Sequence, residues 1–141
     1  MSKGDVFESD FLKLIFNGTA IADLAQDDTS SPATTLTVAL HTADPGETGT
    51  QSTSETAYTG YARVAVARTT GGWTVTGNSV SPVANIDFGE CTASPGAAIT
   101  HASIGTGVSN KLLYSGALSA SITMAVGVIP RIKNTSTITE D

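Results

Sequence analysis

Residues 61–76 read YARVAVARTTGGWTVT and give the clearest structural signal in the chain. Positions 61–68 include a mixture of small and β-branched residues, Gly71-Gly72 marks a turn, and apolar and polar residues alternate over 73–76. Alternation with a period of two and β-branched residues are typical of strands. The stretch therefore predicts two neighbouring strands joined in a hairpin, and a fold built on β structure.

The same pattern continues on both sides of this stretch. Residues 36–41 (LTVALH) alternate as a strand does. Further strands are predicted over 80–88, 98–104, 111–118, 121–126 and 131–139, separated by glycine, proline or asparagine. About seven or eight strands at this spacing are typical of an antiparallel β-sandwich or jelly roll. The predicted fold class is mainly β: an antiparallel, jelly-roll-like β-sandwich.

A helix is predicted only at the N-terminus, over residues 5–25. Phe7, Phe11, Leu14, Ile15 and Ala22 recur at spacings of three and four, as on one face of a helix. Asp5 can serve as the N-cap, with Glu8 three residues later. The internal pair Asn17-Gly18 costs about 1 kcal/mol in helix propensity. Either packing offsets this cost or the helix breaks there.

The length of 141 residues is suited to one compact domain. We expect a single domain over 1–141, with the helix at 5–25 and the β-sandwich at 36–139. The expected core consists of large apolar residues at alternating strand positions and on the helix. They are Leu36, Val38, Leu40, Val64, Val66, Trp73, Val75, Ile86, Phe88, Ile104, Leu112 and Leu113, with Phe7, Phe11, Leu14 and Ile15. For Trp73 a place in the core is favoured over a sugar-binding platform shared with Tyr61.

A long polar connection follows the first predicted strand. Asp44-Pro45-Gly46 has turn chemistry, because proline presets φ and glycine accepts a positive φ. Residues 51–55 (QSTSE) contain no apolar side chain, which predicts an exposed loop. Loops of this length usually bind something or remain mobile.

Composition and charge exclude several classes of protein. Only 14% of residues are charged, while Thr, Ser, Ala and Gly fill 69 of 141 positions. The net charge is −6, so few phosphates could be neutralised and nucleic acid is not an expected partner. No apolar run approaches the roughly 20 residues that cross a bilayer, and the acidic N-terminus is unlike a secretory signal. Cys91 is the single cysteine, which excludes an intramolecular disulfide.

No group of residues predicts catalysis. His41 with Asp44 and Glu47 is the best metal-site candidate, but strand-end histidines bonded to backbone or solvent are the favoured interpretation of His41 and His101. The chain has no Gly-x-Ser-x-Gly, and Cys91 follows Glu90 rather than a base. We therefore predict no enzyme, no catalytic residue, no cofactor and no metal.

Five short elements carry a resemblance to a known family. They are residues 40–46 (LHTADPG), 61–63 (YAR), 73–75 (WTV), 100–105 (THASIG) and 113–118 (LYSGAL). In these elements the chain resembles a family of small tailed-bacteriophage virion structural proteins, often labelled phage tail-fibre proteins. Where that family often has an aromatic residue after the histidine, this chain has Ala102. The resemblance implies a virion component without catalytic activity, assembled in the cytoplasm of a bacterial host.

The expected function is that of a capsid decoration (cement) protein, bound in many copies to the phage head. The alternative is a tail-fibre or tail-associated module that contacts the host surface. Expected partners are other virion proteins, either the major capsid protein or tail proteins, and further copies of the chain. The candidate interface residues are Phe7, Phe11, Arg63 and Arg68. Of these, the apolar contact through the helix is favoured, because surface ion pairs are worth less than about 1 kcal/mol each.

Overall fold

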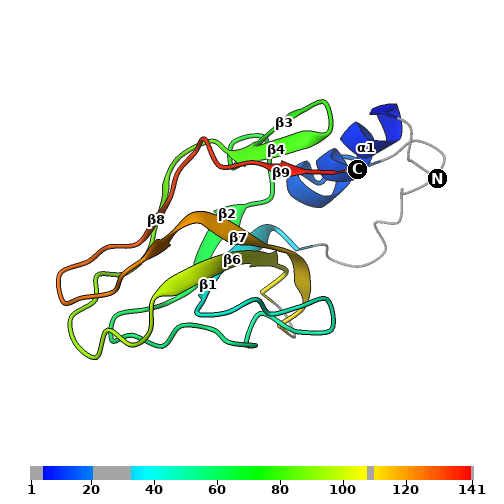
Figure 1. Cartoon of the computed structure of the whole chain (residues 1–141). Helices are drawn as coiled ribbons and strands as arrows, with labels where there is room; N and C mark the ends of the chain where they lie inside the picture. The colour runs from blue at the N-terminus through cyan, green and yellow to red at the C-terminus, as the bar shows by residue number, and fades with distance from the viewer. Residues whose placement is uncertain (1–4, 21–32, 108–109, 141) are drawn as a thin grey trace. The chain divides into compact units, whose positions relative to one another are not determined.

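The structure, a computed structural model, describes residues 5–20, 33–107 and 110–140. Antiparallel sheets dominate it, with one short helix near the N-terminus (Figure 1). The predicted mainly-β class is confirmed, and the division of the strands among separate antiparallel sheets is consistent with a sandwich-like fold. The chain forms two compact units, a first unit of residues 1–34, 67–86 and 132–141 and a second unit of 35–66 and 87–131. The single domain over 1–141 stays a prediction.

The N-terminal helix is shorter than predicted. Helix α1 (Asp5–Leu12) continues as a π-helical segment, η1 (Lys13–Asn17), and ends at Gly18, which has a φ of +66°. A left-handed residue terminates a helix, and glycine adopts that conformation without a steric penalty. The Asn17-Gly18 pair therefore breaks the helix, and the predicted extension to residue 25 is wrong over 18–20. Residues 21–25 lie outside the described part of the chain.

The helix buries a different stripe from the predicted one. Leu12 and Phe16 are fully buried, and the Phe16 ring meets Trp73 edge to face, with centroids 4.9 Å apart. Phe11 is only half-buried. Leu14 and Ile15 are also half-buried, and the side chain of Phe7 lies outside the description. Spacing alone could not decide between these faces, because apolar residues surround most of the helix.

The first unit also holds a three-stranded antiparallel sheet. It consists of β3 (Trp73–Thr76), β4 (Ser79–Pro82) and β9 (Ile138–Thr139), in the order β3-β4-β9. Thr76 pairs with Ser79, so residues 77–78 (Gly-Asn) form a two-residue hairpin loop. Loops of this length and composition favour hairpins. The hairpin predicted between 61–68 and 73–76 is therefore wrong: β3 pairs with the strand after it.

The second unit is built on a four-stranded sheet in the order β2-β1-β6-β7. Its strands are β2 (Val64–Ala67), β1 (Thr35–His41), β6 (Ile99–Gly105) and β7 (Leu112–Ile122). β6 runs antiparallel to both neighbours. The strand predicted at 111–118 continues into the start of the one predicted at 121–126, and together they form β7, with irregular pairing to β6 between residues 117 and 122. The predicted strand over 123–126 is wrong, because β7 ends at Ile122. β5 (Ile86–Asp87) and β8 (Arg131–Ile132) form a separate two-stranded sheet.

Seven of the twelve strand residues predicted for the core are buried. Leu36, Val38, Leu40, Trp73, Ile86, Phe88 and Ile104 are confirmed as core. Five others are half-buried only: Val64, Val66, Val75, Leu112 and Leu113. These five lie on strands with one open side, where polar neighbours leave part of each side chain in contact with solvent.

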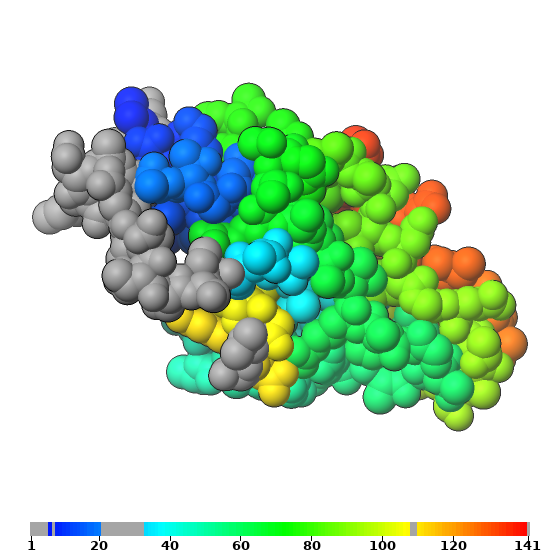
Figure 2. Space-filling view, turned by 180° about the vertical axis from the view of Figure 1, so that it is seen from behind, coloured from blue at the N-terminus to red at the C-terminus, as the bar shows by residue number. Residues whose placement is uncertain are grey.

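Loops of the second unit meet at one place on its surface. Thr59 and Ala93 form an isolated antiparallel bridge, and Thr92 N–H donates to Thr59 O at 2.9 Å. In Figure 2 the teal-green surface of the segment before residue 60 lies beside the yellow-green surface of the segment near residue 90. No helix in the described part of the chain is long and apolar enough to span a membrane.

Candidate functional site

A polar layer covers one face of the four-stranded sheet. Thr37 and His41 on β1 pair with Gly105 and His101 on β6, and side chains two residues apart share a face of a strand. His41 is 0% exposed and Ser103 is 2% exposed. Buried polar groups are stable only when they are hydrogen-bonded. The partners of these side chains therefore decide whether the layer is structural or reactive.

His41 is bonded through both ring nitrogens. Nδ1 lies 2.9 Å from Thr53 O, and Nε2 lies 2.7 Å from Ser103 Oγ. A carbonyl oxygen only accepts, so Nδ1 carries the hydrogen and Nε2 accepts from the Ser103 hydroxyl. Burial lowers the pKa of His41, although the bond to Thr53 O opposes the shift. The imidazole is therefore held in its neutral form.

Gln51 closes the layer from the loop side. Its Oε1 accepts from Thr37 Oγ1 at 2.8 Å, and its Nε2 donates to Thr37 O at 3.0 Å and to Ser103 Oγ at 3.4 Å. Its backbone N–H donates to Asn110 O at 2.9 Å. The side chain is 0% exposed, so the prediction of an exposed loop at 51–55 is wrong at Gln51. Hydropathy carries no signal for a polar side chain buried by its hydrogen bonds. We call Thr37, His41, Gln51 and Ser103 the buried network.

The buried network leaves no room for a side chain at residue 105. A Cβ on Gly105 would lie 2.3 Å from Gln51 Cδ and 2.4 Å from Lys111 O. Real Cβ atoms do not approach other atoms so closely. Only glycine allows the Gln51 amide to lie against β6 at this point.

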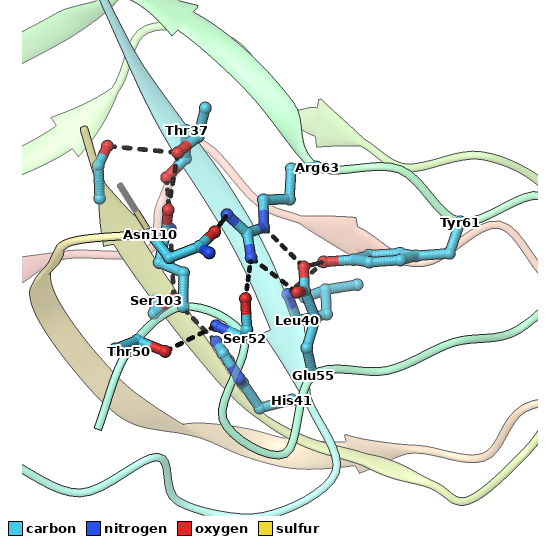
Figure 3. Close-up of polar contacts among 12 residues, drawn as sticks. Thr37, Leu40, His41, Thr50, Ser52, Glu55, Tyr61, Arg63, Ser103 and Asn110 are labelled. Atoms are coloured by element: carbon cyan, nitrogen blue, oxygen red, sulfur yellow. Dashed lines mark hydrogen bonds and ion pairs between the residues drawn. The ribbon is translucent and has the colours of Figure 1, made fainter. Parts of the chain in front are cut away.

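An ion pair closes the outer side of the loop. Arg63 Nε lies 2.7 Å from Glu55 Oε1, and Arg63 Nη2 lies 2.7 Å from Glu55 Oε2 (Figure 3). Tyr61 O–H donates to Glu55 Oε1 at 2.8 Å and accepts from Leu40 N–H at 3.1 Å. Arg63 Nη1 also donates to Asn110 Oδ1 at 2.8 Å. Bidentate pairs of this kind are stronger than single ion pairs.

The ion pair sets the charge state of Glu55. Burial raises the pKa of its carboxyl, but the hydrogen bonds from Arg63 and Tyr61 outweigh that effect. The pKa of Glu55 therefore lies below its usual value, and the pKa of Tyr61 is raised, chiefly by burial. The carboxylate stays ionised well into the acidic range.

We call residues 42–54 the 42–54 loop. Hydrogen bonds hold this loop at its two ends, and the buried network holds it on its inner side. Thr42 N–H donates to Ser54 O at 2.9 Å, and Thr56 N–H donates to Leu40 O at 3.0 Å. At its tip, Gly46 N–H donates to Asp44 Oδ1 at 2.9 Å, and Gly46 has a φ of +71°, which confirms the predicted turn. The loop has an exposed outer side and a fixed inner side.

The candidate metal set does not come together. His41 is enclosed by Thr53 and Ser103, and the Asp44 carboxylate bonds to its own turn. The described residues contain no group of three or more His, Cys, Asp or Glu side chains that could hold a metal ion. The interpretation of His41 as a strand-end histidine bonded to backbone is confirmed, and His101 Nδ1 lies 2.8 Å from Thr100 Oγ1.

The His41–Ser103 pair has the distance of a general base and its nucleophile. The group that orients the imidazole is a backbone carbonyl, and Ser103 Oγ lies next to the Gln51 amide in a buried position. A nucleophile needs space for the reacting atom of a substrate. The geometry therefore supports hydrogen bonding within the fold as the role of this pair.

Both arginines of the candidate interface have partners inside their own unit. Arg63 pairs with Glu55, and the Arg68 guanidinium donates to the carbonyl oxygens of Leu14, Ile15 and Ala33. Arg68 thereby satisfies carbonyl groups that the end of a helix leaves free. The interface through Phe7, Phe11, Arg63 and Arg68 stays a prediction.

The chain matches the model of a known protein family. The sequence model of a family described as Podophage GP4 fiber I protein gp80 matches residues 4–139. The match covers the helix and every strand of both units. No curated protein matches the chain.

Proposed function

Since the chain belongs to the family of Podophage GP4 fiber I protein gp80, we propose that it is a structural component of the phage fibre. Family membership makes it a phage structural protein of a fibre family. Capsid decoration was the first expectation from the sequence and a tail-fibre module the alternative. The family description supports the alternative. The match over residues 4–139 carries this proposal, because it takes in nearly the whole chain.

The polar groups of the second unit support a role without catalysis. The polar side-chain atoms of His41, Ser103 and Gln51 are hydrogen-bonded to one another or to backbone carbonyl oxygens. Glu55 and Arg63 neutralise each other at the edge of the same loop. We therefore propose that the chain is not an enzyme and that its buried polar groups hold the 42–54 loop in one conformation.

The proposed partners are other virion components and further copies of the chain. Arg63, Arg68 and Arg131 each contact groups within the chain, which leaves fewer cations for an acidic partner. Attachment within the particle is proposed to depend mainly on apolar surface. Val6 on α1 is 76% exposed and offers such surface.

The copy number per particle tests this function. Purified virions would be digested, and peptides of this chain would be quantified against isotope-labelled standards, together with peptides of the major capsid and tail proteins. A fibre component is expected at the copy number of the tail proteins. A copy number that follows the capsid protein would overturn the fibre in favour of capsid decoration. Absence of the chain from the virion would overturn both the fibre role and the capsid decoration role.

A further inference from the structure

His41 and His101 are direct cross-strand neighbours. They occupy paired positions on β1 and β6, so their side chains share the face that carries the buried network. His41 is fully enclosed and bonds to Thr53 O of the 42–54 loop, and Gln51 of the same loop bonds to its partner Ser103, whereas His101 is half-buried. Histidine is the side chain whose charge changes between pH 5 and 8. The loop is thus closed over a buried histidine whose pKa is lowered by burial.

Protonation of His41 conflicts with its surroundings. In the neutral state Ser103 O–H donates to Nε2, and Gln51 Nε2 donates to Ser103 Oγ. A proton on Nε2 removes the acceptor of the Ser103 hydroxyl, while Nδ1–H still donates to Thr53 O. The buried side chain then also carries a positive charge, and no carboxylate among the described residues forms an ion pair with it.

Three charged or titratable groups face His41 from the surrounding elements. Glu55 favours the protonated imidazole, whereas Arg63 and His101 disfavour it. Glu55 is engaged by both Arg63 and Tyr61, so its charge is already compensated. Arg63 and His101 therefore lower the pKa of His41, as burial does.

We propose that the 42–54 loop is a proton-sensitive latch, closed over neutral His41 and released from the sheet when His41 is protonated. Release begins on the inner side, where Thr53 O accepts from the imidazole and the Gln51 amide donates to Ser103. The Glu55–Arg63 pair stays ionised over the same range, because the pKa of Glu55 lies below its usual value. The loop therefore opens while it stays anchored at Glu55.

The direction of the pH dependence follows from linkage. The pKa of His41 is depressed in the closed loop, so the open form binds more protons as the pH falls below about 6.5. Closure is complete above that pH and weakens below it. One proton limits the effect to about a tenfold change in the opening constant for each pH unit.

Hydrogen exchange of the full-length protein tests the latch. Protection factors for peptides from the loop would be measured between about pH 7.5 and 5.0 and corrected for intrinsic exchange at each pH. Protection of residues 42–54 is expected to fall with pH, by at most about tenfold for each unit, while protection of β1 and β6 stays constant. Loop protection that does not change over this range would overturn the proposal.

Two glutamine variants assign the effect to one histidine. His41→Gln is expected to abolish the pH dependence, and the matched control His101→Gln is expected to retain it. Retention in His41→Gln would overturn the assignment. If His41→Gln does not fold, the imidazole of His41 can be titrated by NMR in the unmodified protein. Its midpoint must then coincide with the midpoint of loop opening, and a clear separation of the two would also overturn the proposal.

Discussion

At residue 105 the absence of a side chain allows the buried network to form. We predict that Gly105→Ala destabilises the protein by about 1–3 kcal/mol, because the added methyl overlaps Gln51 and the Lys111 carbonyl. Chemical denaturation of the purified protein measures this change. Gly116→Ala on β7 is the matched control, since a Cβ there meets nothing within 4 Å. Equal stabilities of the two variants would contradict the described packing.

The charge of Glu55 contributes to stability in a defined pH range. We predict that Glu55→Gln lowers the free energy of unfolding at neutral pH by about 1 to 2 kcal/mol, because the bidentate bond to Arg63 is lost. The pKa of Glu55 is depressed by folding, so its stabilisation is present above about pH 4.5 and is lost as the pH falls further. The Glu55→Gln variant should not show this loss of stability at acidic pH.

Denaturation curves at several pH values measure both effects. The exposed Glu47→Gln in the same loop is the control and should leave stability at neutral pH unchanged within about 0.5 kcal/mol. A Glu55→Gln curve that still falls in parallel with the unmodified protein at acidic pH would refute the assignment to Glu55.

At this scale the sequence predicted apolar burial well and polar burial poorly. Leu36, Val38 and Leu40 are recognised from alternation alone. Gln51 is equally buried, but its burial depends on Thr37 and Ser103, which are distant in the chain. A polar residue is stable inside a protein only through such specific partners. No local pattern contains that information.

Among the elements, the N-terminal helix depends on one arginine. Arg68 donates to the carbonyl oxygens of Leu14 and Ile15 at the end of η1. We predict that Arg68→Lys costs about 1–3 kcal/mol, because a single ammonium cannot reach the carbonyls that the planar guanidinium bonds together. Fluorescence of Trp73, the one tryptophan, reports the docking of the helix through Phe16.

Arg131→Lys serves as the control for this prediction. Arg131 pairs with Asp87 at an exposed position, where solvent screens the ion pair and it contributes little to stability. Its thermal unfolding should match that of the unmodified protein. An Arg68→Lys variant with the same unfolding midpoint and the same Trp73 emission would show that the guanidinium does not hold the helix.

The sequence located the elements more reliably than it paired them. β1, β3 and β6 are found close to their predicted bounds. The partner of β3 was missed because Gly71-Gly72 and Gly77-Asn78 are both acceptable turns, and the sequence favours neither by alternation. Pairing depends on which turn brings two apolar faces together, and that is a property of the folded chain.

For the whole molecule, we predict that attachment to the particle resists salt. Ion pairs at an exposed interface are screened over about 8 Å at physiological ionic strength, whereas apolar contacts are not weakened by salt. Washing virions in rising NaCl and assaying the released protein measures this. Release at moderate salt would contradict an apolar attachment.

A variant of the exposed helix face tests the same prediction in another way. Val6 is 76% exposed, so Val6→Asp should leave folding intact and weaken incorporation into particles. Phe11→Asp changes a half-buried residue and needs a check of folding before it is interpreted. Normal incorporation of a folded Val6→Asp variant would show that this face is not the contact.

The phage structural class was accessible from the sequence, whereas the place in the virion was not. Short elements such as residues 40–46 carried the resemblance to that class, and in the structure their roles are local: His41 and Asp44 hold a loop and a turn. Such contacts stabilise the chain wherever it is incorporated. The choice between fibre and capsid depends on surfaces that bind other chains.

The location of the protein on the virion tests the central proposal most directly. Gold-labelled antibodies against the full chain would be applied to purified particles and imaged by electron microscopy, with particles that lack the protein as the control. A fibre component predicts label on the fibres and none on the head. Label distributed over the capsid surface would contradict the proposed function.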